Sequence, residues 1–133
     1  MSIDRIANML STIKNASMAK KPVVETVHSR ECEAVAQILK DKGFLRVVKT
    51  FKPAEKSFKM LHIELERDEN EVFALTDVKR VSKPGSRVYK SKDEIHRVAG
   101  GFGILVVSTS RGIFSGDEAK KRNLGGEIIC EVK

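Results

Sequence analysis

The first part of the chain shows the periodicity of helices separated by a short extended segment. Apolar side chains recur at spacings of three and four, at Ile3, Ile6, Leu10 and Ile13. This spacing places them on one face of a helix, for which Ser2 is a suitable N-cap. The β-branched segment 23–27 predicts a strand, and a second helix is expected between the cap residue Ser29 and Gly43. Its buried face would consist of Cys32, Val35, Ala36 and Leu39.

Two further apolar-rich segments, 44–51 and 58–65, flank a polar turn and predict a β-hairpin. The stretch that follows, from Glu66 to Glu71, is polar and acidic, which makes it the best candidate for a boundary in the chain. We therefore expect an N-terminal α-β-α-β-β scaffold unit over residues 1–66 and a second unit over residues 67–133.

The second unit has mainly the pattern of β-structure. Strands are predicted for 72–81, 87–89, 104–107 and 127–132. Segment 108–112 has the composition of a turn-rich loop. Ser115 followed by Glu118 matches a capping box and predicts a short basic helix through Arg122. The fold class that follows is α+β, with the N-terminal unit packed beside a smaller, mainly β C-terminal unit that has one short helix.

The charge is unevenly distributed along the chain. The 133 residues contain 25 lysines and arginines against 18 aspartates and glutamates, a net charge of +7. Residues 78–133 hold 12 basic and 6 acidic side chains, whereas residues 1–77 are almost neutral with 13 and 12. A basic C-terminal half is typical of a protein that binds a polyanion, although a generally soluble basic protein has the same composition.

Composition excludes several classes of protein. Apolar residues make up 41% of the chain, too many for a disordered tail, and no apolar run approaches the roughly 18 residues of a membrane span. The N-terminus lacks the apolar region of a secretory signal. Cys32 and Cys130 lie far apart and outside any CxxC motif, so we expect them in the core of a reduced, intracellular protein without a membrane partner.

Signatures of catalysis are weak. The three histidines lie in separate segments, and none has a metal-ligand spacing. The glycine string 100–103 precedes a strand rather than a helix, which disfavours a dinucleotide or phosphate loop. We expect no catalytic residue, cofactor or metal. The alternative is a small RNA- or nucleotide-processing enzyme with His62 or His96 as a base, although His62, at an alternating strand position, is more simply a half-buried histidine with its hydrogen bonds satisfied. A third possibility is a pure protein-interaction domain.

Two features of the C-terminal half indicate RNA as the polyanion. Ser108, Thr109 and Ser110 are consecutive hydroxyls that either bond to their own backbone in a turn or face the 2′-hydroxyls and base edges of RNA. Basic side chains form two clusters, one on a strand–turn–strand and one on the short helix: Lys79, Arg80, Lys83, Arg87, Lys90 and Lys92, and then Lys120, Lys121 and Arg122. Tyr89 lies within the first cluster, where it is suited to stacking on an unpaired base.

Four C-terminal segments, 81–89, 100–104, 108–112 and 125–127, follow one another in a distinctive order and spacing, and segment 4–16 adds an N-terminal signature. Together these motifs resemble the S8 family of small-subunit ribosomal proteins in its bacterial form. The resemblance implies a two-domain α+β protein that binds an irregular stem in the central domain of small-subunit ribosomal RNA. Members help to organise the platform during assembly, and in some bacteria they repress their own operon messenger.

The resemblance also implies which residues contact RNA. The family's hydroxyl loop, its basic-aromatic strand and its last strand match positions of this chain, and Arg111 and the basic helix add to them. The expected RNA-binding residues are Lys83, Arg87, Tyr89, Ser108, Thr109, Ser110, Arg111, Gly112, Lys120, Lys121, Gly125 and Glu127. Neighbouring ribosomal proteins are expected partners, in a cytoplasmic or organellar ribosome. The chain departs from the family pattern at residues 27–30, where a proline is usual, and at residues 130–133.

Overall fold

The computed structural model describes residues 2–96, 98 and 103–133. The chain divides into two compact units, Met1–Thr76 and Asp77–Lys133. The first has the predicted α-β-α-β-β order, and the second is mainly β with one short α-helix, which confirms the α+β class. Of the glycine string 100–103, only Gly103 lies within the described residues.

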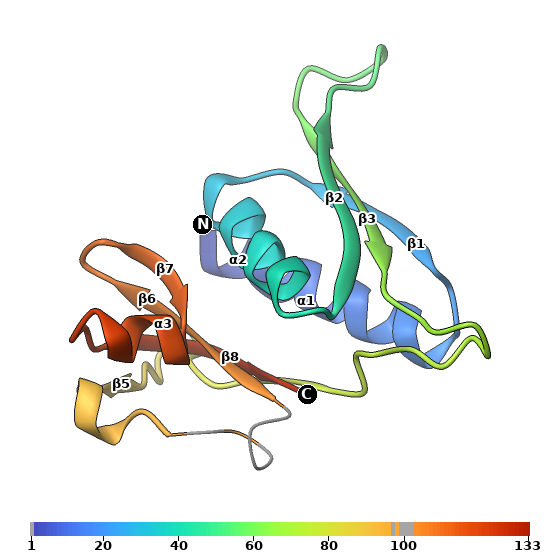
Figure 1. Ribbon diagram of the computed structural model, residues 1–133. Coiled ribbons are helices and arrows are strands. Elements are labelled where there is room, and N and C mark those ends of the chain that lie inside the picture. Colours follow the sequence, from blue (N-terminus) through green and yellow to red (C-terminus); the bar gives the residue numbers. More distant parts are fainter. Residues whose placement is uncertain (1, 97, 99–102) are drawn as a thin grey trace. The chain divides into compact units, whose positions relative to one another are not determined.

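The first unit is a three-stranded antiparallel sheet whose one face is covered by two helices (Figure 1). Its elements are α1 (Ser2–Met18), β1 (Val23–Val27), α2 (Arg30–Asp41), β2 (Leu45–Phe51) and β3 (Met60–Leu65). The strand order is β1-β3-β2, so β3 is central. The predicted apolar faces are buried, as shown by Ile6, Leu10 and Ile13 in α1 and by Cys32, Val35, Ala36 and Leu39 in α2. The Ser29 hydroxyl caps α2 by accepting a hydrogen bond from the Cys32 amide at 3.1 Å.

The first unit continues past residue 66, where composition suggested a boundary, as far as Thr76. The Ala74 amide donates to the Glu66 carbonyl at 3.0 Å, and the Ser17 hydroxyl of α1 donates to the Leu75 carbonyl at 2.5 Å. Leu75 is also buried. A few long-range bonds and one apolar anchor thus attach a polar segment to the preceding unit, and local composition gives no sign of such contacts.

The second unit is a five-stranded antiparallel sheet with one short α-helix (Figure 1). Its elements are β4 (Val78–Arg80), β5 (Tyr89–Lys90), the 3₁₀ helix η1 (Lys92–Glu94), β6 (Ile104–Thr109), β7 (Gly112–Ser115), α3 (Gly116–Lys121) and β8 (Gly126–Val132). The order is β4-β8-β6-β7, and β5 pairs with β8 as well. Leu105, Val107, Ala119 and Ile128 belong to one buried cluster, so α3 packs on the sheet face that carries these side chains.

Two predicted segments differ from the structure. The strand predicted for 72–81 is limited to Val78–Arg80, because the residues before it belong to the first unit. Segment 108–112, predicted as a loop, contains the end of β6, a tight turn and the first residue of β7. The strand β7 was not predicted, since the glycine and hydroxyls around it are typical of turns.

Candidate nucleic-acid interface

Three of the predicted residues lie in one row across the second sheet. Glu127 of β8 pairs with Tyr89 of β5 on one side and with Ser108 of β6 on the other. Directly paired residues in antiparallel strands present their side chains on the same face. Residues far apart in the sequence therefore form a continuous Tyr89–Glu127–Ser108 row.

This row lies on the sheet face opposite α3. Val107 and Ile128 contribute to the cluster beneath α3, and side chains alternate between faces along a strand. Ser108 follows Val107 and Glu127 precedes Ile128, so both point away from the helix. Tyr89 is 67% exposed, and a phenol ring at the solvent surface is free to stack on a base.

Glu127, the acidic residue of the row, forms an ion pair with Arg87. The Arg87 guanidinium donates to the Glu127 carboxylate at 3.1 Å. Glu127 is more shielded than its partner, with side-chain exposures of 17% and 36%. Glu127 therefore orients the Arg87 guanidinium on this face of the sheet.

The glycine pair at the start of β8, Gly125 and Gly126, allows neighbouring strands to approach closely. A Cβ atom on Gly126 would overlap the Ser108 carbonyl, and one on Gly125 would lie 2.5 Å from the Lys90 carbonyl oxygen. No larger residue fits against both strands without moving backbone. The predicted site residue Gly125 thus has a structural part in the site, since it lets β8 join β5 to β6.

The hydroxyl turn is closed by one of its own side chains. The Thr109 hydroxyl donates to the Gly112 carbonyl at 2.8 Å and accepts from the Arg111 amide at 3.1 Å. Gly112 has φ +126°, a conformation that side chains disfavour. Ser110 and Arg111 form the exposed tip. Among the described residues, the Ser108 and Ser110 hydroxyls make no side-chain hydrogen bond, so they stay available to a ligand.

The basic residues of α3 have different environments. Ser115 caps the helix by accepting from the Glu118 amide at 3.3 Å, as predicted for the N-cap, and the Glu118 carboxylate accepts from Arg122 at 3.1 Å. The Lys120 ammonium donates to the Ile95 carbonyl at 3.2 Å, and Arg122 lies over the Phe114 ring, 4.6 Å from its centroid. Lys121 is exposed at the last position of the helix. Of the predicted cluster, Lys121 is therefore the residue best placed to meet a phosphate.

Lys83 lies at a turn that joins β4 to β5. Its amide donates to the Ser86 carbonyl at 3.0 Å, and Ser86 returns the bond at 2.9 Å. Sequence reasoning missed Ser82, which is fully buried and accepts from the Val88 amide at 2.9 Å, fixing this turn against β5. A cleft of about 340 Å³ adjoins the turn, and its polar lining includes Lys79, Lys83, Ser86, Lys90, His96 and Glu131.

Most of the predicted residues therefore gather at one end of the sheet, on both of its faces, whereas Lys83 lies on the turn between β4 and β5. Tyr89 and Ser108 occupy one face, and α3 with Lys121 covers the other. The β6–β7 turn, the end of α3 and β5 meet at the left-hand end of this unit in Figure 1. A folded RNA that wraps this end could touch Tyr89, Ser108 and Arg87 on one face together with Lys121 at the end of α3 on the other.

His62, one of the two histidines considered as a catalytic base, is engaged in ordinary structural contacts. His62 hydrogen-bonds the Glu64 carboxylate at 2.9 Å and lies 3.7 Å from Glu25, as expected of a histidine on a sheet surface. Burial raises the pKa of the Cys130 thiol to about 12, which keeps the thiol protonated and unreactive. The described residues contain no group of three potential metal ligands, and none of their helices has the length and apolarity to span a bilayer.

Comparison with known proteins identifies the family. Residues 4–132 match the family model described as ribosomal protein S8. The chain belongs to the S8 family. It is 42% identical over 132 residues to small ribosomal subunit protein uS8 of Sulfurovum sp., and likewise to that of Nautilia profundicola, with 99% of each chain covered. The protein of the same name from Caldicellulosiruptor bescii is 42% identical over 130 residues, covering 98% of this chain and 97% of the relative.

Membership of the S8 family confirms the resemblance drawn from the motifs. The family consists of structural ribosomal proteins rather than enzymes, so the prediction that this chain is not an enzyme is also confirmed. The match covers both units, including the first, whose sequence carried fewer family motifs.

Proposed function

We propose that this S8 family member is a structural constituent of the small ribosomal subunit, which binds an irregular stem in the central domain of the ribosomal RNA. By this contact it helps to organise the platform during assembly. The names of its relatives, all small ribosomal subunit proteins, support the proposal that the protein belongs to the small subunit. The single observation that carries the RNA interface is the Tyr89–Glu127–Ser108 row beside the hydroxyl turn.

Two kinds of contact contribute to RNA binding in different ways. Exposed cations, above all Arg111 and Lys121, attract phosphates without regard to sequence, and this attraction weakens steeply with salt. Tyr89, Ser108 and Ser110 provide selectivity, because stacking and short hydrogen bonds require an RNA shape that reaches all of them at once. A regular duplex offers phosphates on a uniform surface but no unpaired base for Tyr89.

The same interface would accept any RNA with the same shape. Repression of the protein's own operon messenger follows from the proposal if the messenger folds into a mimic of the ribosomal stem. Neighbouring proteins of the small subunit are the remaining proposed partners. The bacterial relatives favour a cytoplasmic ribosome.

Filter binding with two RNAs tests the proposal. The full chain should bind a central-domain stem of small-subunit ribosomal RNA far more tightly than a regular duplex of equal length. Tyr89→Ala should cost about 1–3 kcal/mol on the stem, the usual worth of one stacked base, and little on the duplex. Tyr89→Phe, which keeps the ring, is the control. Equal affinity of the unmodified protein for both RNAs would contradict a selective interface.

A further inference from the structure

The first unit is nearly neutral as a whole, but it contains a strongly basic hairpin. Residues 49–59, which we call the basic hairpin, contain four lysines and one glutamate. The rest of residues 1–76 holds nine basic and ten acidic side chains. The positive excess of this unit is therefore concentrated in one segment, at the end of β2 and in the connection to β3.

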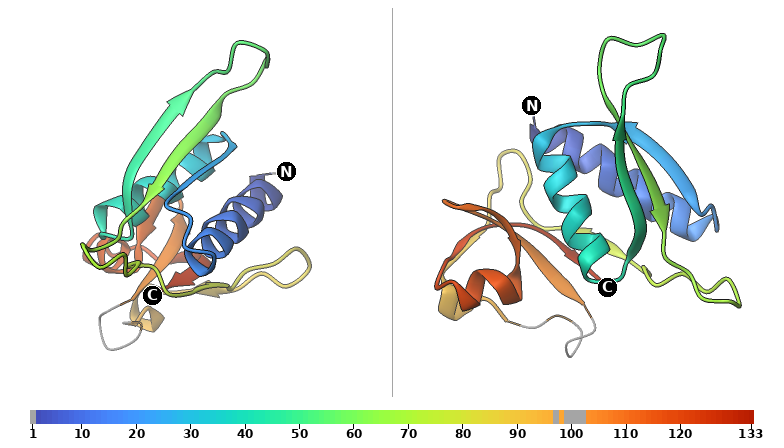
Figure 2. Two further views of the ribbon diagram at one scale, coloured as in Figure 1. Left: turned by 90° about the vertical axis from the view of Figure 1, so that its right-hand side faces the viewer. Right: turned by 45° about the horizontal axis from the view of Figure 1, so that its top comes forward.

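The basic hairpin extends away from the sheet into solvent (Figure 2). Its lysines Lys49, Lys52, Lys56 and Lys59 are all exposed. Within the described part of the chain, none of the four makes an ion pair with a carboxylate. Positive charges gathered in one segment repel one another, and a bound polyanion removes that repulsion.

An aromatic ring lies among these lysines. Phe58 is 45% exposed, and the Lys56 ammonium lies 5.4 Å from its ring centroid. The ring packs under a flexible lysine rather than in a core, so a ligand can displace the lysine and take its place. Cations around an exposed ring are the combination that binds single-stranded or unpaired nucleotides.

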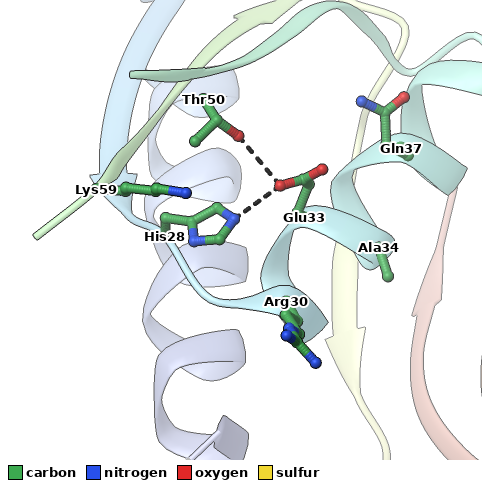
Figure 3. Close-up of a pocket in the computed structure, with 7 residues that line it drawn as sticks. All are labelled: His28, Arg30, Glu33, Ala34, Gln37, Thr50 and Lys59. Carbon is green, nitrogen blue, oxygen red and sulfur yellow. Dashed lines mark hydrogen bonds and ion pairs between the residues drawn. The ribbon is translucent and has the colours of Figure 1, made fainter. Parts of the chain in front are cut away.

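The cleft at the base of the hairpin extends the same chemistry onto α2 (Figure 3). It is lined by Arg30 at the first position of α2 and by Lys59. The only carboxylate in its lining, Glu33, already accepts hydrogen bonds from His28 at 2.7 Å and from Thr50 at 3.1 Å. Arg30 and Lys59 thus line a cleft whose carboxylate, Glu33, already has hydrogen-bond partners.

We propose that the basic hairpin is a second RNA contact, in which Lys52, Lys56 and Lys59 bind phosphates and Phe58 stacks on an unpaired base. This inference rests on the proposed function and extends it to the unit that carries little net charge. The Tyr89–Glu127–Ser108 row on the second sheet selects the RNA stem, and the basic hairpin binds an adjoining strand of the same RNA. An acidic protein would be attracted by the same lysines, but an exposed ring beside them favours a nucleotide.

The salt dependence of binding by the full chain tests this contact. K52A/K56A should make the slope of log affinity against log salt shallower by about 0.7–0.9 for each lysine that contacts a phosphate. The matched control K21A/K40A removes the same charge from exposed lysines elsewhere in the first unit and should leave the slope near that of the unmodified protein. The RNA must be a central-domain fragment longer than the stem, so that the second contact is present.

Directed cleavage provides an independent readout. Cys32 and Cys130 are fully buried, so an iron chelate attaches selectively to a new cysteine at A54C, within the exposed hairpin turn. It should cut the RNA outside the stem, whereas a chelate at N70C, on a different exposed loop of the unit, should not. An unchanged slope together with no cutting from A54C would overturn the hairpin contact. If the unmodified protein still prefers the stem, the proposed function survives that result.

Discussion

The Thr109 hydroxyl donates to the Gly112 carbonyl oxygen at 2.8 Å, across the turn between β6 and β7. It also accepts from the Arg111 amide, so both roles of the hydroxyl are used within the turn. Thr109 is therefore a positioning residue, which fixes the tip formed by Ser110 and Arg111. The sequence left open whether these hydroxyls bond to their own backbone or face RNA, and for Thr109 the first alternative is correct.

Thr109 and Ser110 are consequently expected to affect RNA binding in different ways. Thr109→Ala should lower both the melting temperature and the affinity for the stem, because it loosens the turn. Thr109→Ser keeps the bonding oxygen and should restore both. Ser110→Ala should lower only the affinity, by roughly 0.5–1.5 kcal/mol for one hydrogen bond. Thermal unfolding and filter binding measure the two effects, and a melting temperature unchanged by Thr109→Ala would contradict the positioning role.

Adding a single methyl group at Gly126 should strongly reduce the stability of the fold. Gly126→Ala places Cβ onto the Ser108 carbonyl and within 3.2 Å of the Thr109 Cα. Both neighbours are backbone atoms, so relieving the overlap requires the strands to move apart. We expect destabilisation of at least about 3 kcal/mol, the upper range for overpacking. The control is Gly43→Ala, where φ is +88° but no atom lies within 4 Å. Its left-handed conformation alone should cost about 1–2 kcal/mol. Urea unfolding that gives equal losses for the two variants would rule out the close approach of β8.

Much of the fold was predictable because its signals are local. The apolar periodicity around Leu10 and Leu39 and the caps Ser29 and Ser115 depend on neighbours within a turn or two. The attachment of the segment before Thr76 to the first unit has no local signal, because its anchor, the Ser17–Leu75 bond, joins residues 58 positions apart. Strand β7 was missed for a related reason, since it becomes a strand only by pairing with β6.

The candidate site was predictable by residue type more than by arrangement. Motifs and charge identified Tyr89, Ser108 and Lys121, but sequence offers no means of assigning them to sheet faces. That assignment depends on the register of β8, which shifts at an irregularity in its pairing with β6, between Val106 and Val107. The Arg87–Glu127 pair, 40 positions apart, was equally invisible.

Lys121 should contribute to binding through charge alone. It is exposed at the end of α3, so Lys121→Ala should weaken binding to stem and duplex alike and reduce the salt slope by about 0.7–0.9. Lys120→Ala is the informative comparison, because the Lys120 ammonium is bound to the Ile95 carbonyl and its loss should lower stability as well. Salt titrations with an unaltered slope for Lys121→Ala would remove this residue from the interface.

The first unit should lose stability in acid through Glu33. The hydrogen bond from His28, supported by one from Thr50, holds the pKa of the Glu33 carboxyl below its ordinary value of 4.5 (Figure 3). A lowered folded-state pKa stabilises the fold above the unfolded pKa, and this contribution is lost as the pH falls through the folded one. Glu33→Gln should therefore be less stable than the unmodified chain at pH 7, and the difference should vanish in strong acid. Urea unfolding across that range measures it; a difference that persists after Glu33 is protonated would mean that shape, rather than charge, accounts for its effect.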